Sequence, residues 1–134
     1  MRANGLSARR RVEMRKRILV VDDDQTLRSL IQELLEDEAY KVDTAIDGLD
    51  ALEQLDHQQN VYDVILLDLT MPRINGLQFL QTVQQQGLIP LRSIIALSGD
   101  EKALQQAACM GIYSILKKPI DLDALLVLVG GAMC

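Results

Sequence analysis

The sequence predicts an α/β domain in which five parallel strands alternate with five helices, a doubly wound (βα)5 sheet. Two observations support this fold. Short continuous apolar runs alternate with stretches that have helical spacing along the chain. The apolar runs consist of Val, Ile and Leu, which is typical of strands buried on both faces of a parallel sheet with helices on each side. Because 134 residues can bury one core but hardly two, we expect one domain.

The first half of the chain supplies three strands and two helices. The clearest helix is "TLRSLIQELLEDE", in which leucine and isoleucine recur at i, i+3, i+4, i+7 and i+8. Asp24 precedes it and is a plausible N-cap. The elements expected here are a strand at 18–21, a helix at 26–38, a strand at 40–45, a helix at 48–56 and a strand at 61–69.

The second half begins with "TMPRING", a loop by its proline and glycine. Leu77, Leu80 and Val83 then mark a third helix by their spacing. The remaining elements are a strand at 92–100, a helix at 100–110, a strand at 113–119 that ends at Pro119, and a helix at 121–129 with Asp121 near its start.

Charge is distributed unevenly between the start of the chain and the rest. The first 17 residues carry a net charge of +6 and residues 18–134 carry −11. An acidic body does not resemble a nucleic-acid surface, so we expect no direct binding of nucleic acid. Residues 1–16 read as a basic, disordered leader without an assigned function, and residues 17–134 as the folded domain.

Several other functional classes lack their usual signals. No apolar run approaches the roughly 18 residues that span a bilayer, and no signal peptide is present, so we expect a cytoplasmic protein. Cys109 and Cys134 stand apart without a CxxC motif and are expected to be free thiols. The single histidine, His57, lies in a polar loop and is expected to be solvated. No GxGxxG or GxxxxGK[ST] motif is present.

Polar residues follow four of the predicted strands. In parallel sheets, ligands bind beyond the carboxyl ends of the strands, where the strand order reverses. The residues collected there are Asp22 and Asp23 after the first strand, Asp68 after the third, Ser98 after the fourth, and Lys117 or Lys118 after the fifth.

Three converging carboxylates repel one another and favour a bound cation. They would repel by roughly 3 to 4 kcal/mol per pair at about 5 Å and an effective dielectric constant near 20. Oxygen ligands without His or Cys favour Mg²⁺ over zinc. Taken alone, the triplet from Asp22 to Asp24 fits a solvated turn that caps a helix equally well. The strand-end arrangement as a whole is what points to a metal site.

These residues resemble the receiver domain of two-component response regulators of the chemotaxis-regulator type. The resemblance runs from Arg17 to Val129 and rests on "VVDDD", "LLDLTMPRINGL", "ALSG" and "KKP" in the family's order. It implies a flavodoxin-like sheet with strand order 2-1-3-4-5. It also implies that Asp68 accepts a phosphoryl group from a phosphohistidine donor, either a sensor histidine kinase or a histidine phosphotransfer protein.

The resemblance assigns a role to each strand-end residue. Asp23 is expected to bind Mg²⁺ directly, Asp22 to orient the ligands of the metal, and Asp68 and the backbone carbonyl of Thr70 to complete the metal site. The remaining residues are expected to contact phosphoryl oxygens: Ser98 in the family's Thr/Ser position, and Lys118 rather than Lys117 because the family's lysine directly precedes the proline. A cis Lys118–Pro119 peptide is also implied.

The resemblance further implies a signalling protein rather than an enzyme with a turned-over substrate. Phosphorylation should alter contacts with a downstream protein through the face made by the fourth helix, fifth strand and fifth helix. Ile115 occupies the family's usual aromatic position, and we expect Tyr113 to be a partly buried strand residue rather than a relocated switch. The apolar stretch "ALLVLVGGAM" indicates either core packing or a homodimer or partner seam on that face.

Two alternatives remain open. A phosphatase of the haloacid-dehalogenase type also uses an aspartyl phosphate, but requires a second aspartate two residues after the nucleophile, where this chain has Thr70. A pseudo-receiver would serve only as a docking module. Only 15 residues follow Pro119, too few for an output domain, so we expect output by protein contact unless this chain is a fragment of something longer.

Overall fold

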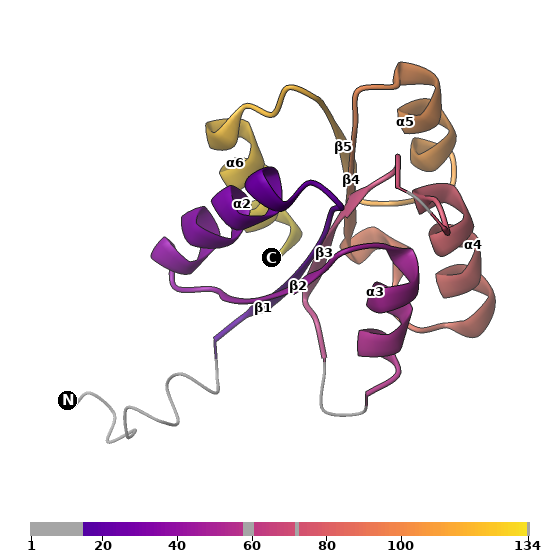
Figure 1. Ribbon diagram of the computed structural model, residues 1–134, viewed down its shortest axis with the longest axis horizontal. Helices are drawn as coiled ribbons and strands as arrows, with labels where there is room; N and C mark the ends of the chain where they lie inside the picture. The colour runs from indigo at the N-terminus through magenta and orange to yellow at the C-terminus, as the bar shows by residue number, and fades with distance from the viewer. Residues whose placement is uncertain (1–14, 58–60, 72, 134) are drawn as a thin grey trace.

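Five parallel strands form the centre of the molecule (Figure 1). The computed structural model describes residues 15–57, 61–71 and 73–133. Within these residues the strand order is β2-β1-β3-β4-β5, as predicted, and each neighbouring pair is parallel. The strands are β1 (Arg17–Val21), β2 (Lys41–Ala45), β3 (Val64–Asp68), β4 (Ile94–Ser98) and β5 (Ser114–Lys117).

Helices cover both faces of the sheet (Figure 1). One face carries α2 and α6, and the other carries α3, α4 and α5. The bounds are α2 (Gln25–Asp37), α3 (Gly48–Leu55), α4 (Gly76–Gln86), α5 (Glu101–Ala108) and α6 (Leu122–Ala132). A short 3-10 helix, η1 (Leu91–Ser93), precedes β4 and was not predicted, because three residues are too few to show a hydrophobic period. Among the described helices, none has both the length and the apolar character that a membrane span requires.

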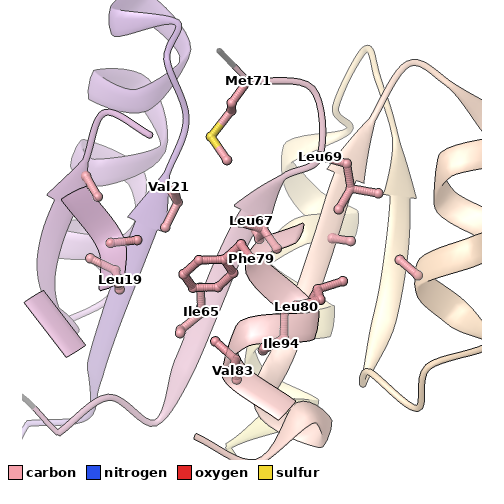
Figure 2. Packing of buried hydrophobic residues seen from close by; sticks show 14 of the residues in the cluster. Leu19, Val21, Ile65, Leu67, Leu69, Met71, Phe79, Leu80, Val83 and Ile94 are labelled. Carbon is pink, nitrogen blue, oxygen red and sulfur yellow. The ribbon is translucent and has the colours of Figure 1, made fainter. Parts of the chain in front are cut away.

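The two-sided covering explains why the strands are continuously apolar. Successive side chains of a strand point to opposite faces, so β1 sends Leu19 to one core cluster and Val20 to the other. Figure 2 shows the larger cluster, in which Phe79 of α4 lies over Ile65 of β3 and Leu80 belongs to the same cluster. Burying a side chain of this size contributes roughly 1.5 to 3 kcal/mol. Both clusters are needed to hold the strand ends at fixed positions.

Each long helix begins at the same edge of the sheet and has a polar N-cap. Asp24 caps α2 by accepting hydrogen bonds from the amides of Thr26 and Leu27, as predicted. Asp47, Asn75, Asp100 and Asp121 cap the helices that follow. These caps hold the helices close to the carboxyl ends of the strands.

Some expectations need correction or fall outside the described residues. Tyr113 lies one position before β5 rather than in it, and 41% of its surface is exposed. Its hydroxyl instead lies against Gly131 of α6, where the missing side chain leaves room for it. Cys109 is a free, exposed thiol as predicted, and His57 is exposed. The predicted leader lies outside the described residues except for its last two positions, and Cys134 also lies outside them.

Candidate functional site

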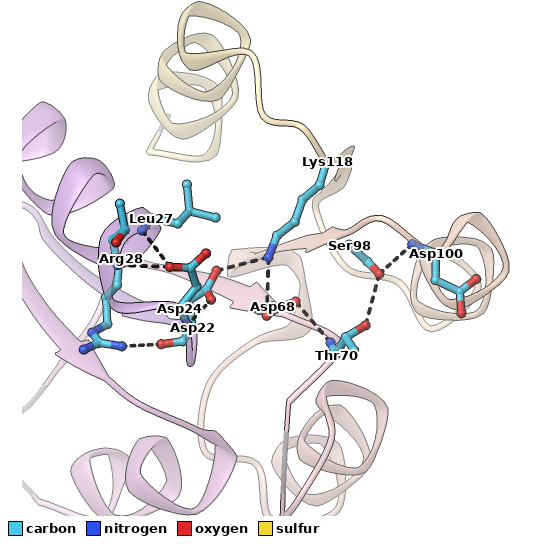
Figure 3. A network of polar contacts seen from close by, with 10 residues as sticks. Asp22, Asp24, Leu27, Arg28, Asp68, Thr70, Ser98, Asp100 and Lys118 are labelled. Atoms are coloured by element: carbon cyan, nitrogen blue, oxygen red, sulfur yellow. Dashed lines mark hydrogen bonds and ion pairs between the residues drawn. The ribbon is translucent and has the colours of Figure 1, made fainter.

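Four strands deliver polar residues to one edge of the sheet (Figure 3). Asp22 follows β1, Asp68 is the last residue of β3, Ser98 is the last residue of β4, and Lys118 follows β5. The chain enters the sheet at β1 and places β2 on one side of it and β3 on the other. This is the point where strand order reverses, at which open α/β sheets bind ligands.

Asp22, Asp23 and Asp68 form one carboxylate cluster. One oxygen from each lies within 4.8 Å of the others. Asp22 is fully buried and Asp68 is 2% exposed, whereas Asp23 faces solvent. The Nζ atom of Lys118 lies 3.4 Å from Oδ2 of Asp22 and 3.4 Å from Oδ2 of Asp68. One ammonium group therefore faces two carboxylates of a cluster of three.

The donor chemistry of this cluster fits a hard divalent cation. Its side-chain donors are all carboxylate oxygens, and its three negative charges exceed the single positive charge of Lys118. Mg²⁺ prefers such oxygen donors and retains several waters, which the exposed position of Asp23 allows. Thr70 is exposed beside the cluster, and the metal-binding role of its carbonyl stays a prediction.

The surroundings of Asp68 alter its acidity. Burial raises the pKa of Asp68 to about 6, and the negative charge of Asp22 adds to the rise. The Thr70 amide, which donates to Oδ1 of Asp68 at 3.1 Å, and the ammonium of Lys118 oppose the rise. Burial lowers the pKa of Lys118, but the charges of Asp68 and Asp22 outweigh it and the net shift is upward. At neutral pH Asp68 is therefore mostly an ionised, nucleophilic carboxylate beside a protonated lysine.

The two candidate lysines point in different directions. Lys118 reaches the carboxylates, whereas Lys117 makes an exposed ion pair with Glu101, with 3.6 Å between Nζ and Oε2. Alternation along an extended chain sends neighbouring side chains to opposite sides, so both lysines cannot serve one site. The Lys118–Pro119 peptide is cis, as expected.

Ser98 lies at the far side of the cluster and is fully buried. Its Oγ accepts a hydrogen bond from the Asp100 amide at 2.9 Å. The Oγ1 atom of Thr70 lies 3.5 Å from the same oxygen. One of the two lone pairs of the Ser98 oxygen is thus engaged by the backbone, and its hydroxyl hydrogen can turn towards a group that arrives at Asp68.

One residue near the cluster was missed in the sequence. Arg28, in the first turns of α2, donates from Nη1 to the backbone carbonyl of Asp22 at 2.7 Å (Figure 3). A helix that starts directly after an acidic loop places its fourth residue one turn above that loop. The spacing could have shown that Arg28 lies near the loop, but it does not show in which direction the Arg28 side chain points.

Comparison with known proteins gives consistent matches. The family model described as the response regulator receiver domain matches residues 18–130. Response regulator ArlR of Staphylococcus saprophyticus is 37% identical over 110 residues, which cover 82% of this chain and 49% of ArlR. Chemotaxis protein CheY of Treponema pallidum is 32% identical over 106 residues, which cover 78% of this chain and 74% of that protein. The chain therefore spans about half the length of ArlR.

A solved structure matches the fold as well. Chemotaxis protein CheY4 of Vibrio cholerae superposes with a TM-score of 0.78 at 29% sequence identity. The match covers 88% of this chain and 98% of CheY4. The helices, the parallel sheet and its strand order are thus shared with solved receiver domains.

Proposed function

The chain belongs to the family of response regulator receiver domains, and from this membership we propose that it accepts a phosphoryl group on Asp68 in two-component signalling. The observation that supports this proposal best is the cluster of Asp22, Asp23 and Asp68 within 4.8 Å, with Lys118 at 3.4 Å from two of them. Such an arrangement combines a carboxylate nucleophile with an excess of negative charge that a divalent cation would balance.

In the proposed reaction, an oxygen of Asp68 attacks the phosphorus atom of a phosphohistidine donor. A bond forms between that oxygen and phosphorus, while the bond from phosphorus to the donor's imidazole nitrogen breaks and the imidazole leaves with its electron pair. Asp22, Asp23, Asp68 and the Thr70 carbonyl would hold Mg²⁺, which supplies neutralisation of the phosphoryl oxygens. Lys118 adds a second positive charge on the same side as Asp68.

After transfer, Ser98 and Lys118 would bind the new phosphoryl oxygens. The Ser98 oxygen accepts from the Asp100 amide, and its hydrogen, which can otherwise face Oγ1 of Thr70, would turn to donate to a phosphoryl oxygen. The Lys118 ammonium would exchange one carboxylate partner for a phosphoryl oxygen. Charge-assisted hydrogen bonds of this kind contribute roughly 1.5 to 3 kcal/mol each, enough to bias the loop that leads from Ser98 into α5.

The proposed partners follow from this chemistry. The donor is a sensor histidine kinase or a histidine phosphotransfer protein, met in the cytoplasm, and the recipient of the signal is a downstream protein. We place the output on the face made by α5, β5 and α6, where Val127 is 73% exposed and Tyr113 is 41% exposed. The same apolar face is where a homodimer would form.

Acetyl phosphate tests the proposal without a cognate kinase. Incubation of the whole chain with acetyl phosphate and Mg²⁺ should add one phosphoryl group by intact mass, and base or hydroxylamine should remove it, as expected for an acyl phosphate. Asp68→Asn should abolish this addition.

Asp24→Asn is the matched control, because it removes a carboxylate next to the cluster while keeping an N-cap residue. It should retain the addition within about twofold of the parent, a change of about 0.4 kcal/mol at most. Label that persists in Asp68→Asn, or that resists hydroxylamine, would assign the chemistry to another residue. No label in the parent would favour a docking module that is not phosphorylated.

A further inference from the structure

Asp22 is fixed at every polar atom. Its amide donates to the carbonyl of Ala45 at 3.1 Å, and its Oδ1 accepts from the Asp24 amide at 2.8 Å. Its Oδ2 faces Lys118, and its backbone carbonyl accepts from Arg28. Figure 3 shows the Arg28 guanidinium and the Lys118 ammonium approaching Asp22 from opposite sides. Arg28 therefore contacts the backbone of the acidic loop and not its carboxylates.

Asp23 has much weaker support of its own. Its side chain faces solvent, and within the described part of the chain no hydrogen bond is made to its carboxylate. Its position in the cluster must come from the backbone. The Asp22 carbonyl and the Asp23 amide belong to one planar peptide unit, so a hydrogen bond that holds the carbonyl also orients the residue that follows.

We infer that Arg28 is a positioning residue for the metal centre, which it serves by holding the Asp22–Asp23 peptide so that the Asp23 carboxylate stays beside Asp22 and Asp68. This inference rests on the proposed function, because it concerns the same Mg²⁺ site. The hydrogen bond spans from the second turn of α2 to the loop that precedes the helix. This hydrogen bond connects α2 to the loop that carries Asp22 and Asp23.

The positive charge of Arg28 predicts the opposite effect on metal binding. A guanidinium near the cluster repels a cation, so if charge were its main influence, removing it would tighten Mg²⁺ binding. If it acts by positioning, removing it weakens Mg²⁺ binding, because groups that orient metal ligands typically change affinity by about tenfold or more. The two roles therefore predict changes of opposite sign.

The test is a Mg²⁺ titration of the whole chain, in which the amide signal of Asp23 in ¹⁵N–¹H spectra monitors binding. Arg28→Met keeps the length and helix propensity of the side chain but removes its donors and charge. We expect its Kd for Mg²⁺ to rise about tenfold, and we expect Arg28→Lys, which keeps one donor and the charge, to recover most of that loss. Arg92→Met, which removes an exposed arginine beside the opposite edge of the sheet, should leave the Kd within about twofold.

The outcomes separate this inference from the proposed function. A Kd in Arg28→Met that is unchanged or lower than in the parent would overturn the positioning role while leaving the metal site intact. Equal weakening in Arg28→Lys and Arg28→Met would also overturn it, since the retained donor would have no effect. Failure of the parent to respond to Mg²⁺ would overturn both the metal site and the role of Arg28.

Discussion

Two buried aspartates at the same edge of the sheet have opposite environments. Asp47, at the start of α3, is 4% exposed, and Asp68, at the end of β3, is 2% exposed. Asp47 accepts from the Asp50 amide at 2.9 Å and from Nε of Arg73 at 2.7 Å. Asp68 shares the ammonium of Lys118 with Asp22. Asp47 therefore pairs with Arg73, whereas Asp68 shares Lys118 with a second carboxylate.

The acidities of the two groups differ accordingly. Burial acts to raise the pKa of Asp47, but the Asp50 amide and the Arg73 guanidinium outweigh it and hold the pKa below its usual value. Burial and the charge of Asp22 raise the pKa of Asp68 to about 6. A buried carboxylate paired within the protein stabilises a loop, whereas one left short of positive charge is available to bind a ligand. The charge of Asp47 is therefore balanced within the protein, whereas the cluster around Asp68 keeps an excess of negative charge.

The largest expected effect is on stability at Asp68. In protein free of divalent cations, Asp68→Asn should raise the free energy of unfolding at pH 7 by about 2 kcal/mol, because it removes a buried charge. The folded-state pKa lies above the unfolded value, so the cost of the charge is fully present above pH 6 and disappears below about pH 4. Urea unfolding of parent and variant at pH 4 and pH 7 measures the difference. If the free energies of unfolding of parent and variant differed by the same amount at pH 4 and at pH 7, the charge of Asp68 would not be the cause.

Asp47→Asn should change stability in the opposite direction. Asparagine can keep the N-cap, but Arg73 loses the charge of its partner, so the free energy of unfolding at pH 7 should fall by about 1.5 kcal/mol. The folded-state pKa of Asp47 is depressed, so this contribution is present above the unfolded value near pH 4 and is lost as the pH falls further. Phosphorylation by acetyl phosphate should continue in this variant. If the free energy of unfolding at pH 7 changed in the same direction in Asp47→Asn and Asp68→Asn, the two carboxylates would not differ in charge balance.

Mg²⁺ should act on one of the two regions only. Asp23→Ala should weaken Mg²⁺ binding by about tenfold and reduce the thermal stabilisation that Mg²⁺ gives the parent. Asp47→Asn should bind Mg²⁺ as the parent does. Calorimetric titration of the three proteins measures the affinities, and thermal unfolding with and without Mg²⁺ measures the stabilisation. Unchanged affinity in Asp23→Ala would exclude Asp23 from the site.

The smallest effect on stability is expected at Ser98. Ser98→Ala removes one neutral hydrogen bond from the Asp100 amide and should cost about 1 kcal/mol or less. Phosphorylation of Asp68 should be largely retained, but the accompanying shifts of the α5 amide signals should disappear. Ile115→Ala, which changes a partly buried residue of the core, should reduce those shifts less. Full shifts in Ser98→Ala would mean that the signal leaves Asp68 by another route.

Much of the fold could be predicted because it depends on local pattern. Continuous apolar runs and helical spacing identified the five strands and the five long helices, although the third and fourth strands are shorter than the apolar runs suggested. Tyr113 falls outside β5 because the chain extends the sheet only from Ser114, which pairs with Ile95. The 3-10 helix before β4 could not be predicted because its three residues are too few to show a hydrophobic period.

By itself, the sequence determined which polar residues lie near the carboxyl ends of the apolar runs, and parallel strands necessarily bring such residues to one edge. Asp22, Asp68 and Ser98 could therefore be grouped without coordinates. Only the tertiary structure decided which neighbours face the cluster. Lys118 turns inward and Lys117 outward, a choice that the pattern of strand ends had left open, and Arg28 reaches back to a carbonyl. Side-chain direction depends on the packing of α2 and on the path of the chain after β5, and neither is a local property of the sequence.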